Sequence, residues 1–192
     1  MPPKTKFTKA DIVEAAFELA KAEGFTGITA RGVASRLGCS VAPIYVNFAT
    51  IEELVDAVVK RIFAISDEML ANQKGSNIFE NIGRASIAFA REYPVLLRDL
   101  VLQPNPYMAS YASIESAMVE LLAQDESLRG WTLEQRKRLL FKVRVFQVGL
   151  SVMVANGHLP SWLDENSTDA VLMEAGDDFV LAGATRMEEN KQ

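Results

Sequence analysis

The chain has 192 residues, of which 49% are hydrophobic and 23% are charged, close to the usage of an ordinary globular protein. Its single cysteine, Cys39, excludes an internal disulfide framework, and its single histidine, His158, argues against most metal-binding clusters, so we expect no metal and no cofactor. The net charge of −5 speaks against a nucleic-acid binder, whose domain is usually basic.

The charge is unevenly distributed along the chain. Residues 1–50 carry six basic and four acidic residues, a net charge of +2, whereas residues 51–192 carry 14 basic and 21 acidic residues, a net charge of −7. Such an asymmetry is a hint that the basic part contacts nucleic acid. No targeting segment is visible, and no uncharged apolar run reaches the roughly 18 residues that a membrane helix needs, so we expect a cytoplasmic protein.

Three short helices are predicted before residue 50. Each follows a hydroxyl residue that can cap its first turn, and the first two end at a glycine, as helices commonly do. The expected N-caps are Thr8, Thr29 and Ser40, and the terminating glycines are Gly24 and Gly38. Pro43 falls in the first turn of the third helix, where its missing N–H costs nothing.

Six further helices are predicted from apolar residues that recur at intervals of three and four. They span about residues 50–69, 77–93, 95–102, 107–123, 131–156 and 166–187. No hairpin signal and no internal repeat interrupts the pattern. The fold class is therefore all-α, with about nine helices, of which the first three form a compact head.

The turn between the second and third helices is Gly38-Cys39-Ser40, a short glycine-containing turn of the kind found in a helix-turn-helix. In this region the sequence resembles the TetR family of bacterial transcriptional regulators, over roughly residues 8–59. The segments that carry the resemblance are Ile12–Ala16, Gly24–Thr29, Val33–Ser40, Ile44-Tyr45, Phe48 and Glu52–Leu54. The resemblance implies a DNA-binding domain over residues 1–49 and a ligand-binding and dimerisation domain over residues 50–192.

The resemblance also implies a homodimer that inserts the third helix of each subunit into the major groove of a palindromic operator. Arg31 then reaches a base edge, Ala42 and Pro43 suit contact with thymine methyl groups, and Tyr45 matches a phosphate-contacting tyrosine. The full set of expected DNA contacts is Lys6, Thr29, Arg31, Ser40, Val41, Ala42, Pro43, Tyr45, Asn47 and Thr50. The helix that starts at Thr50-Ile51 is expected to point its positive end at a phosphate as well.

Two features depart from the family's pattern. The family commonly has a lysine where this chain has Ile51, and the third helix contains no Lys or Arg. DNA affinity is therefore expected to depend on Lys4, Lys6 and Lys9, as an arm that follows the backbone or a minor groove. The alternative function is a helical small-molecule-binding protein whose head no longer binds DNA.

For the second domain, the resemblance implies a pocket for a small effector that releases a repressor from DNA. Its helices are rich in aromatic and flexible side chains, which suit an apolar or aromatic effector, although such stripes also suit an ordinary core. The expected effector contacts are Phe63, Phe89, Tyr93, Met108, Tyr111, Phe146, Gln147 and Leu150. No motif in the sequence identifies the effector, the operator or the regulated genes.

The last two predicted helices are the candidates for dimerisation. One carries the stripe Leu140, Val143, Gln147, Leu150 and Val154, and the other the stripe Leu172, Ala175, Phe179 and Ala182. The resemblance to the TetR family favours dimerisation, and the alternative is that these stripes face the core of their own domain. An enzyme is not expected, because adjacent acidic pairs on a helix diverge by about 100° and no nucleophile accompanies the histidine.

Overall fold

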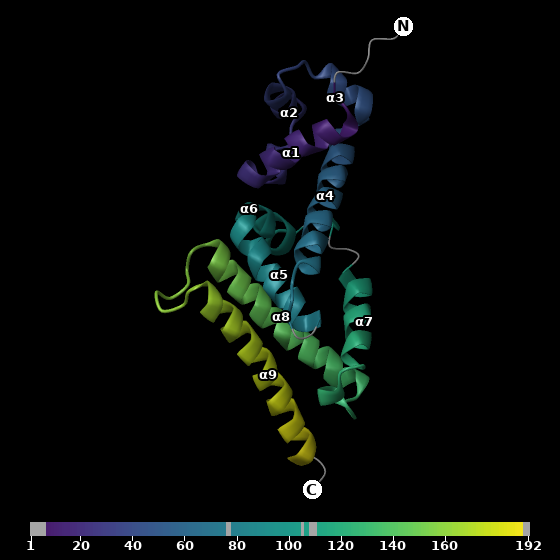
Figure 1. Ribbon diagram of the computed structural model, residues 1–192. Coiled ribbons are helices and arrows are strands. Elements are labelled where there is room, and N and C mark those ends of the chain that lie inside the picture. The colour runs from purple at the N-terminus through teal and green to yellow at the C-terminus, as the bar shows by residue number, and fades with distance from the viewer. Residues whose placement is uncertain (1–6, 76–77, 105, 108–110, 190–192) are drawn as a thin grey trace. The chain divides into compact units, whose positions relative to one another are not determined.

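The computed structural model describes residues 7–75, 78–104, 106–107 and 111–189 (Figure 1). Every regular element in these residues is helical and none is a strand, which confirms the predicted fold class. The nine α-helices of the described residues are α1 (Lys9–Glu23), α2 (Ala30–Leu37), α3 (Ala42–Asn47), α4 (Ile51–Ala71), α5 (Ile78–Glu92), α6 (Pro94–Leu97), α7 (Tyr111–Leu122), α8 (Leu133–Ala155) and α9 (Glu165–Glu189). Shorter helical turns are η1 (Phe25–Gly27), η2 (Arg98–Leu102) and η4 (Glu126–Leu128).

A first compact unit comprises residues 7–72 and 92–104, with helices α1 to α4, α6 and the π-helical turn η2. Helix α1 packs against α2, α4 and α6 (Figure 1). The head contributes Ile12, Ala16, Phe17, Val33, Ile44 and Phe48 to the buried core, and α4 adds Leu54, Val58 and Ile62. These residues stand at three- and four-residue spacing, so the apolar periodicity of the sequence selects the buried face of each helix correctly.

Two of the three predicted N-caps in the head are confirmed. The Thr8 hydroxyl accepts the Asp11 N–H at 3.2 Å, and the Asp11 carboxylate accepts the Thr8 N–H at 2.7 Å, which lowers the pKa of Asp11. Thr29 accepts the Gly32 N–H at 3.0 Å. The prediction for Ser40 is wrong, because the N-cap of α3 is Val41. A cap at Ser40 would address position N3, where Pro43 has no N–H to donate.

A second compact unit comprises residues 73–91 and 106–189 and contains most of α5 together with α7, α8 and α9. Helices α8 and α9 lie side by side, joined by a loop at one end (Figure 1). One buried cluster gathers Val119, Leu122, Leu128, Trp131, Leu139 and Leu140, and a second gathers Ile87, Leu150 and Leu172. Trp131 lies so close to Gly183 of α9 that a Cβ at this glycine would overlap the indole ring.

The packing units differ from the division expected at residue 49. Helix α4 and the short helix α6 belong to the same compact unit as the head, because their apolar faces complete its core. The division into a DNA-binding domain and a ligand-binding domain remains a prediction about function. Among the described helices, none is both long and apolar enough to cross a lipid bilayer.

Candidate functional site

Helices α2 and α3 of the first unit form a helix-turn-helix. Helix α2 ends at Gly38 with φ 64° and ψ 39°, a left-handed conformation that glycine adopts without steric cost. The Cys39 N–H donates to the Ala34 carbonyl at 2.9 Å, which closes the end of α2 before the chain turns into α3. Ile44 and Phe48 are buried and hold α3 on the core, so the opposite face of α3 is left at the surface.

That outer face carries most of the expected recognition residues. Exposed here are Ser40, Val41, Ala42 and Tyr45, whereas Pro43 and Asn47 are half-buried. The Asn47 side-chain amide donates to the Pro43 carbonyl at 2.8 Å, so part of its donor capacity serves α3 itself. Val46, which the sequence analysis did not select, is 73% exposed. Its spacing of four residues from Ala42 is the signal that could have found it.

Helix α2 presents two further expected contacts. Arg31 is exposed in the first turn of α2, and Thr29 is the exposed N-cap of the same helix. The Thr29 hydroxyl uses its oxygen as an acceptor for the cap and keeps its own hydrogen for a further acceptor such as a phosphate. Both residues are therefore exposed on the same helix, and their contact with DNA stays a prediction.

The basic residues expected to form an N-terminal arm divide into two groups. Lys4 and Lys6 lie outside the described residues. Lys9 is the first residue of α1, with its ammonium 3.8 Å from the Glu53 carboxylate and 5.1 Å from the ring centre of Phe48. An ion pair and a cation–π contact tie it to the folded head, so the expectation that Lys9 belongs to a flexible arm is wrong.

At the start of α4, side chains accept hydrogen bonds from the backbone N–H groups of Ala49 and Glu53. Thr50 caps the helix by accepting the Glu53 N–H at 3.2 Å, and the Glu53 carboxylate accepts the Ala49 N–H at 2.8 Å. Glu52 and Glu53 both lie in the first turn. Because two carboxylates already occupy the positive end of the helix dipole, this arrangement weighs against a phosphate at Thr50.

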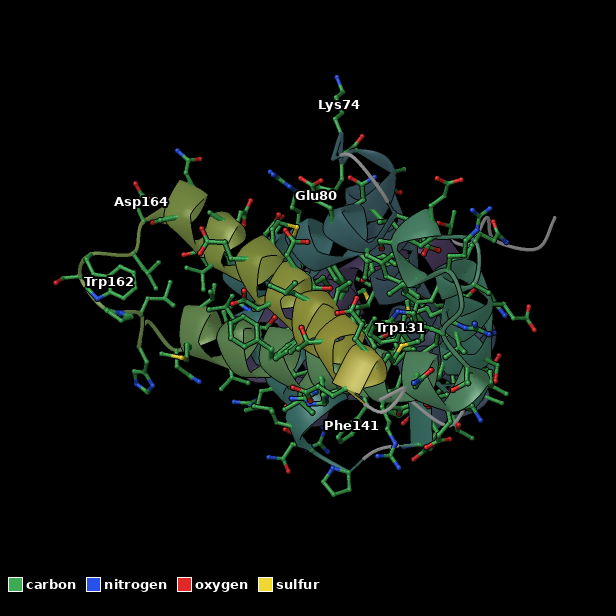
Figure 2. All side chains as sticks on the ribbon, turned by 90° about the horizontal axis from the view of Figure 1, so that it is seen from below. Lys74, Glu80, Trp131, Phe141, Trp162 and Asp164 are labelled. Atoms are coloured by element: carbon green, nitrogen blue, oxygen red, sulfur yellow. The ribbon has the colours of Figure 1, made fainter. Side chains whose placement is uncertain are left out.

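The second unit holds a cavity of about 750 Å³ between helices α5, α7, α8 and α9, a volume within the range of sites for drug-sized molecules. Its apolar lining includes Phe79, Leu122, Leu139, Leu140, Val143, Leu172 and Val180, and its polar lining is Glu80, Asp125, Ser127, Gln147 and Asp177. Glu80, labelled in Figure 2, is paired with Arg84 at 2.8 Å. The described residues form no group of three or more side chains suited to a metal ion.

The eight expected effector contacts do not gather at this cavity. Gln147 lines it, whereas Phe89 and Leu150 are buried and Phe146 packs edge-on against Phe179 at 6.3 Å between ring centres. Phe63 and Tyr93 belong to the first unit. Met108 and the side chain of Tyr111 lie outside the described part of the structure. An apolar side chain at helical spacing suits a core and a cavity equally well, so spacing alone does not separate the two.

Tyr93 belongs to an aromatic cluster of the first unit instead. Its ring centre lies 6.0 Å from that of Phe17, and the Lys21 ammonium lies within 5.8 Å of both rings. The Tyr93 hydroxyl donates to the Glu92 carboxylate at 2.6 Å. Burial, and then the hydrogen bond and charge of Glu92, raise the pKa of Tyr93 to about 12. The neutral phenol is therefore part of what holds α6 against α1.

This raised pKa predicts a loss of stability at alkaline pH. The pKa of a tyrosine is about 10 when unfolded, so the stabilisation by Tyr93 is complete below pH 10 and is lost as the pH rises through about 12. The loss is expected to reach about 3 kcal/mol, from a rise of two pKa units at about 1.36 kcal/mol per unit. Urea denaturation at several pH values should show it in the parent chain and not in Tyr93→Phe. An equal alkaline loss in both proteins would contradict the assignment.

The contact between Asp99 and the Phe25 N–H in the first unit could not be predicted from the sequence. The short helix expected over residues 95–102 is α6 followed by η2, and η2 places Asp99 against the turn after α1. The Asp99 carboxylate accepts the Phe25 N–H at 2.7 Å and pairs with Arg98 at 2.9 Å. The two residues joined by this bond are 74 positions apart, and an isolated aspartate in a helical segment gives no signal of such a partner.

Taken together, the geometry defines a helix-turn-helix protein with a separate helical unit that holds a cavity. Residues 12–58 match the sequence profile described as "Bacterial regulatory proteins, tetR family". This segment therefore belongs to the TetR family, whose members are DNA-binding transcriptional regulators rather than enzymes.

One relative carries a similar sequence, and solved structures share the fold. The chain is 31% identical over 112 residues to the HTH-type transcriptional repressor DrrR1 of Streptomyces coeruleorubidus, a match that spans 57% of this chain and 41% of that repressor. A TetR-like transcriptional regulator from Rhodococcus sp. RHA1 shares the fold, with a TM-score of 0.64 at 18% identity over 88% of this chain and 92% of the other. SmeT, the repressor of the Stenotrophomonas maltophilia multidrug efflux pump SmeDEF, gives 0.63 at 17% identity over 93% and 91%.

Proposed function

We propose that this protein is a transcriptional repressor that binds a palindromic operator as a homodimer and is released by a small apolar or aromatic effector. The observation that carries the proposal is the outer face of α3. Ile44 and Phe48 hold the helix on the core, while Ala42, Tyr45 and Val46 stay exposed. In helix-turn-helix dimers, two such helices enter major grooves about 34–36 Å apart or at a multiple of that distance.

Selection of bound DNA from a random pool tests this function. We expect enrichment of a palindrome at low salt, with half-sites one helical turn or a multiple of it apart. Few basic residues are available to displace counterions, so the salt dependence of the affinity should be modest. If the full chain enriches no palindrome, the function is instead that of a helical small-molecule-binding protein. The absence of charged residues from 37–51 favours this second candidate.

Arg31 and Tyr45 are proposed to play different roles in the complex. A guanidinium can bond two acceptors of a guanine, a contact worth about 1–3 kcal/mol against the wrong base, whereas a hydroxyl on a phosphate carries no sequence information. Arg31→Ala should therefore relax the preference at one base pair per half-site, and Tyr45→Phe should weaken binding evenly on all sequences. Binding profiles on a library of operator variants measure both effects. Unchanged preferences in Arg31→Ala would contradict its role as a base contact.

The homodimer is proposed to form through the exposed side of α8. Leu140 and Leu150 of the expected stripe are buried within their own unit, as the alternative interpretation of that stripe foresaw. Four apolar residues of α8 are instead exposed: Leu133 (54%) in its first turn, and Phe141 (68%), Val145 (57%) and Met153 (39%) farther along. Gly149, between the last two, is exposed as well and has open space around its Cα. An apolar strip of this kind on a regulator is typical of an association surface.

The cavity of the second unit is the proposed effector site. Its apolar lining suits an apolar or aromatic body, and the Gln147 amide can orient one polar group of the ligand. An effector can release DNA only if it binds the two states of the dimer with different affinity. A thermal-shift screen of apolar and aromatic compounds, repeated with Gln147→Leu, tests the location of the site, since stabilisation that depends on Gln147 supports the cavity.

A further inference from the structure

The apolar residues on the outer face of α3 follow a spacing of four residues. On a helix, residues four apart are neighbours, so Val41 pairs with Tyr45 and Ala42 pairs with Val46. All four are exposed, whereas Ile44 and Phe48, also four apart, are buried on the opposite side. The two pairs therefore form one continuous surface, which we call the α3 outer face.

Hydrogen-bonding groups are scarce on and beside this face. No charged residue occurs from Leu37 to Ile51, and the Asn47 amide already donates to the Pro43 carbonyl at 2.8 Å. The polar side chains that remain beside the apolar ones are the hydroxyls of Ser40 and Tyr45. A helix that reads base edges mainly through hydrogen bonds would need more donors and acceptors than this one presents.

Val46 is the most prominent apolar group of the α3 outer face. Its side chain is 73% exposed, compared with 53% for Tyr45 and 38% for Val41. A single exposed valine is ordinary on a protein surface. Here, however, it stands on the helix that the proposed function inserts into the major groove, in line with Ala42 and one turn beyond it.

The major groove offers one apolar feature to such a side chain, the C5-methyl group of thymine. We propose that Val46 is a specificity-determining residue that packs on a thymine methyl group in each operator half-site. The proposal rests on the proposed function, because it names what the α3 outer face reads once it is in the groove. Val46 thus joins Arg31, so that one residue selects by apolar contact and the other by hydrogen bonds.

Deoxyuridine substitution tests the proposal, since deoxyuridine is thymidine without the methyl group. In the selected operator, each thymine is replaced in turn, symmetrically in both half-sites, and the dissociation constant is measured for the full chain. Loss of one buried methyl group corresponds to about a fourfold loss of affinity per half-site, and so to about 15-fold for the symmetric pair. We expect one thymine position to show this loss in the parent protein.

Variants then assign the effect to a residue. In Val46→Ala the affinity ratio of thymine to deoxyuridine at that position should fall to near one. The matched variant Val101→Ala, which changes a valine 38% exposed on η2 and outside the α3 outer face, should keep the parent ratio. Both side chains are exposed, so neither change should alter the circular dichroism spectrum. A ratio within twofold at every thymine of the parent, or an unchanged ratio in Val46→Ala, overturns the proposal while operator binding stands. Failure to enrich any operator contradicts the proposed function itself, and the proposal with it.

Discussion

Replacing Phe141 by glutamate is expected to convert the protein to a monomer and to abolish specific operator binding. Phe141, labelled in Figure 2, is 68% exposed on α8. Val145 and Met153 extend the apolar strip along the same helix. A carboxylate buried in the proposed interface would lose its hydration with no partner to compensate. Because a dimer binds its second half-site at an effective concentration in the millimolar range, operator affinity should fall by a factor of about 10²–10⁴.

Light scattering after gel filtration measures the mass, and a fluorescence anisotropy titration measures the affinity. Leu133→Glu is the matched control, because Leu133 is a leucine 54% exposed at the first position of the same helix and outside the strip. It places the same charge in the first turn, where the helix dipole favours an acid. A Phe141→Glu variant that remains a dimer would show that the subunits associate through another surface.

In the head, local sequence signals predict helix caps and buried residues correctly. Thr8 and Thr29 each cap a helix as predicted, because an N-cap is decided within four residues. The buried residues Ile12, Val33 and Ile44 likewise follow from spacing alone. The predicted cap at Ser40 was wrong because Pro43, three residues later, has no N–H to donate to the Ser40 hydroxyl. Two local rules conflict at this position, and no long-range contact is involved.

The second unit contains features that local sequence signals do not predict. The stripe of α8 predicts that one side of the helix is apolar, but Phe141 and Val145 lie on the other side, so α8 is apolar on two sides. Periodicity cannot say which side meets the chain's own core and which is left for a partner. The cavity is a product of the packing of four helices, and among the expected effector residues whose side chains the structure describes, only Gln147 lines it. Contacts between distant segments, such as Asp99 with the Phe25 N–H, depend on the tertiary fold alone.

Helix α1 ends in a conformation that only glycine accepts, and Gly24→Ala is therefore expected to be strongly destabilising. Gly24 has φ 84° and ψ −176°, a region that is essentially restricted to glycine and costs other residues about 1–3 kcal/mol. A Cβ there would overlap the Asp99 carboxylate and lie 2.8 Å from the Arg98 guanidinium. Displacing Asp99 would break its bond to the Phe25 N–H, and a hydrogen bond to a charged group contributes about 1.5–3 kcal/mol. The expected loss in the free energy of unfolding is about 3–5 kcal/mol.

Urea denaturation followed by far-ultraviolet circular dichroism measures this loss, and Gly38→Ala is the matched control. Gly38 also has a positive φ, 64°, but a Cβ there would meet no atom within 4 Å, so only the strain of about 1–2 kcal/mol should appear. In an Asp99→Ala background the Gly24→Ala substitution should cost less, because the overlapping carboxylate is gone, and the double-mutant cycle measures that difference. If Gly24→Ala costs no more than Gly38→Ala, Asp99 does not hold the end of α1, and the link between η2 and the head has to be sought in the packing of Tyr93 on Phe17.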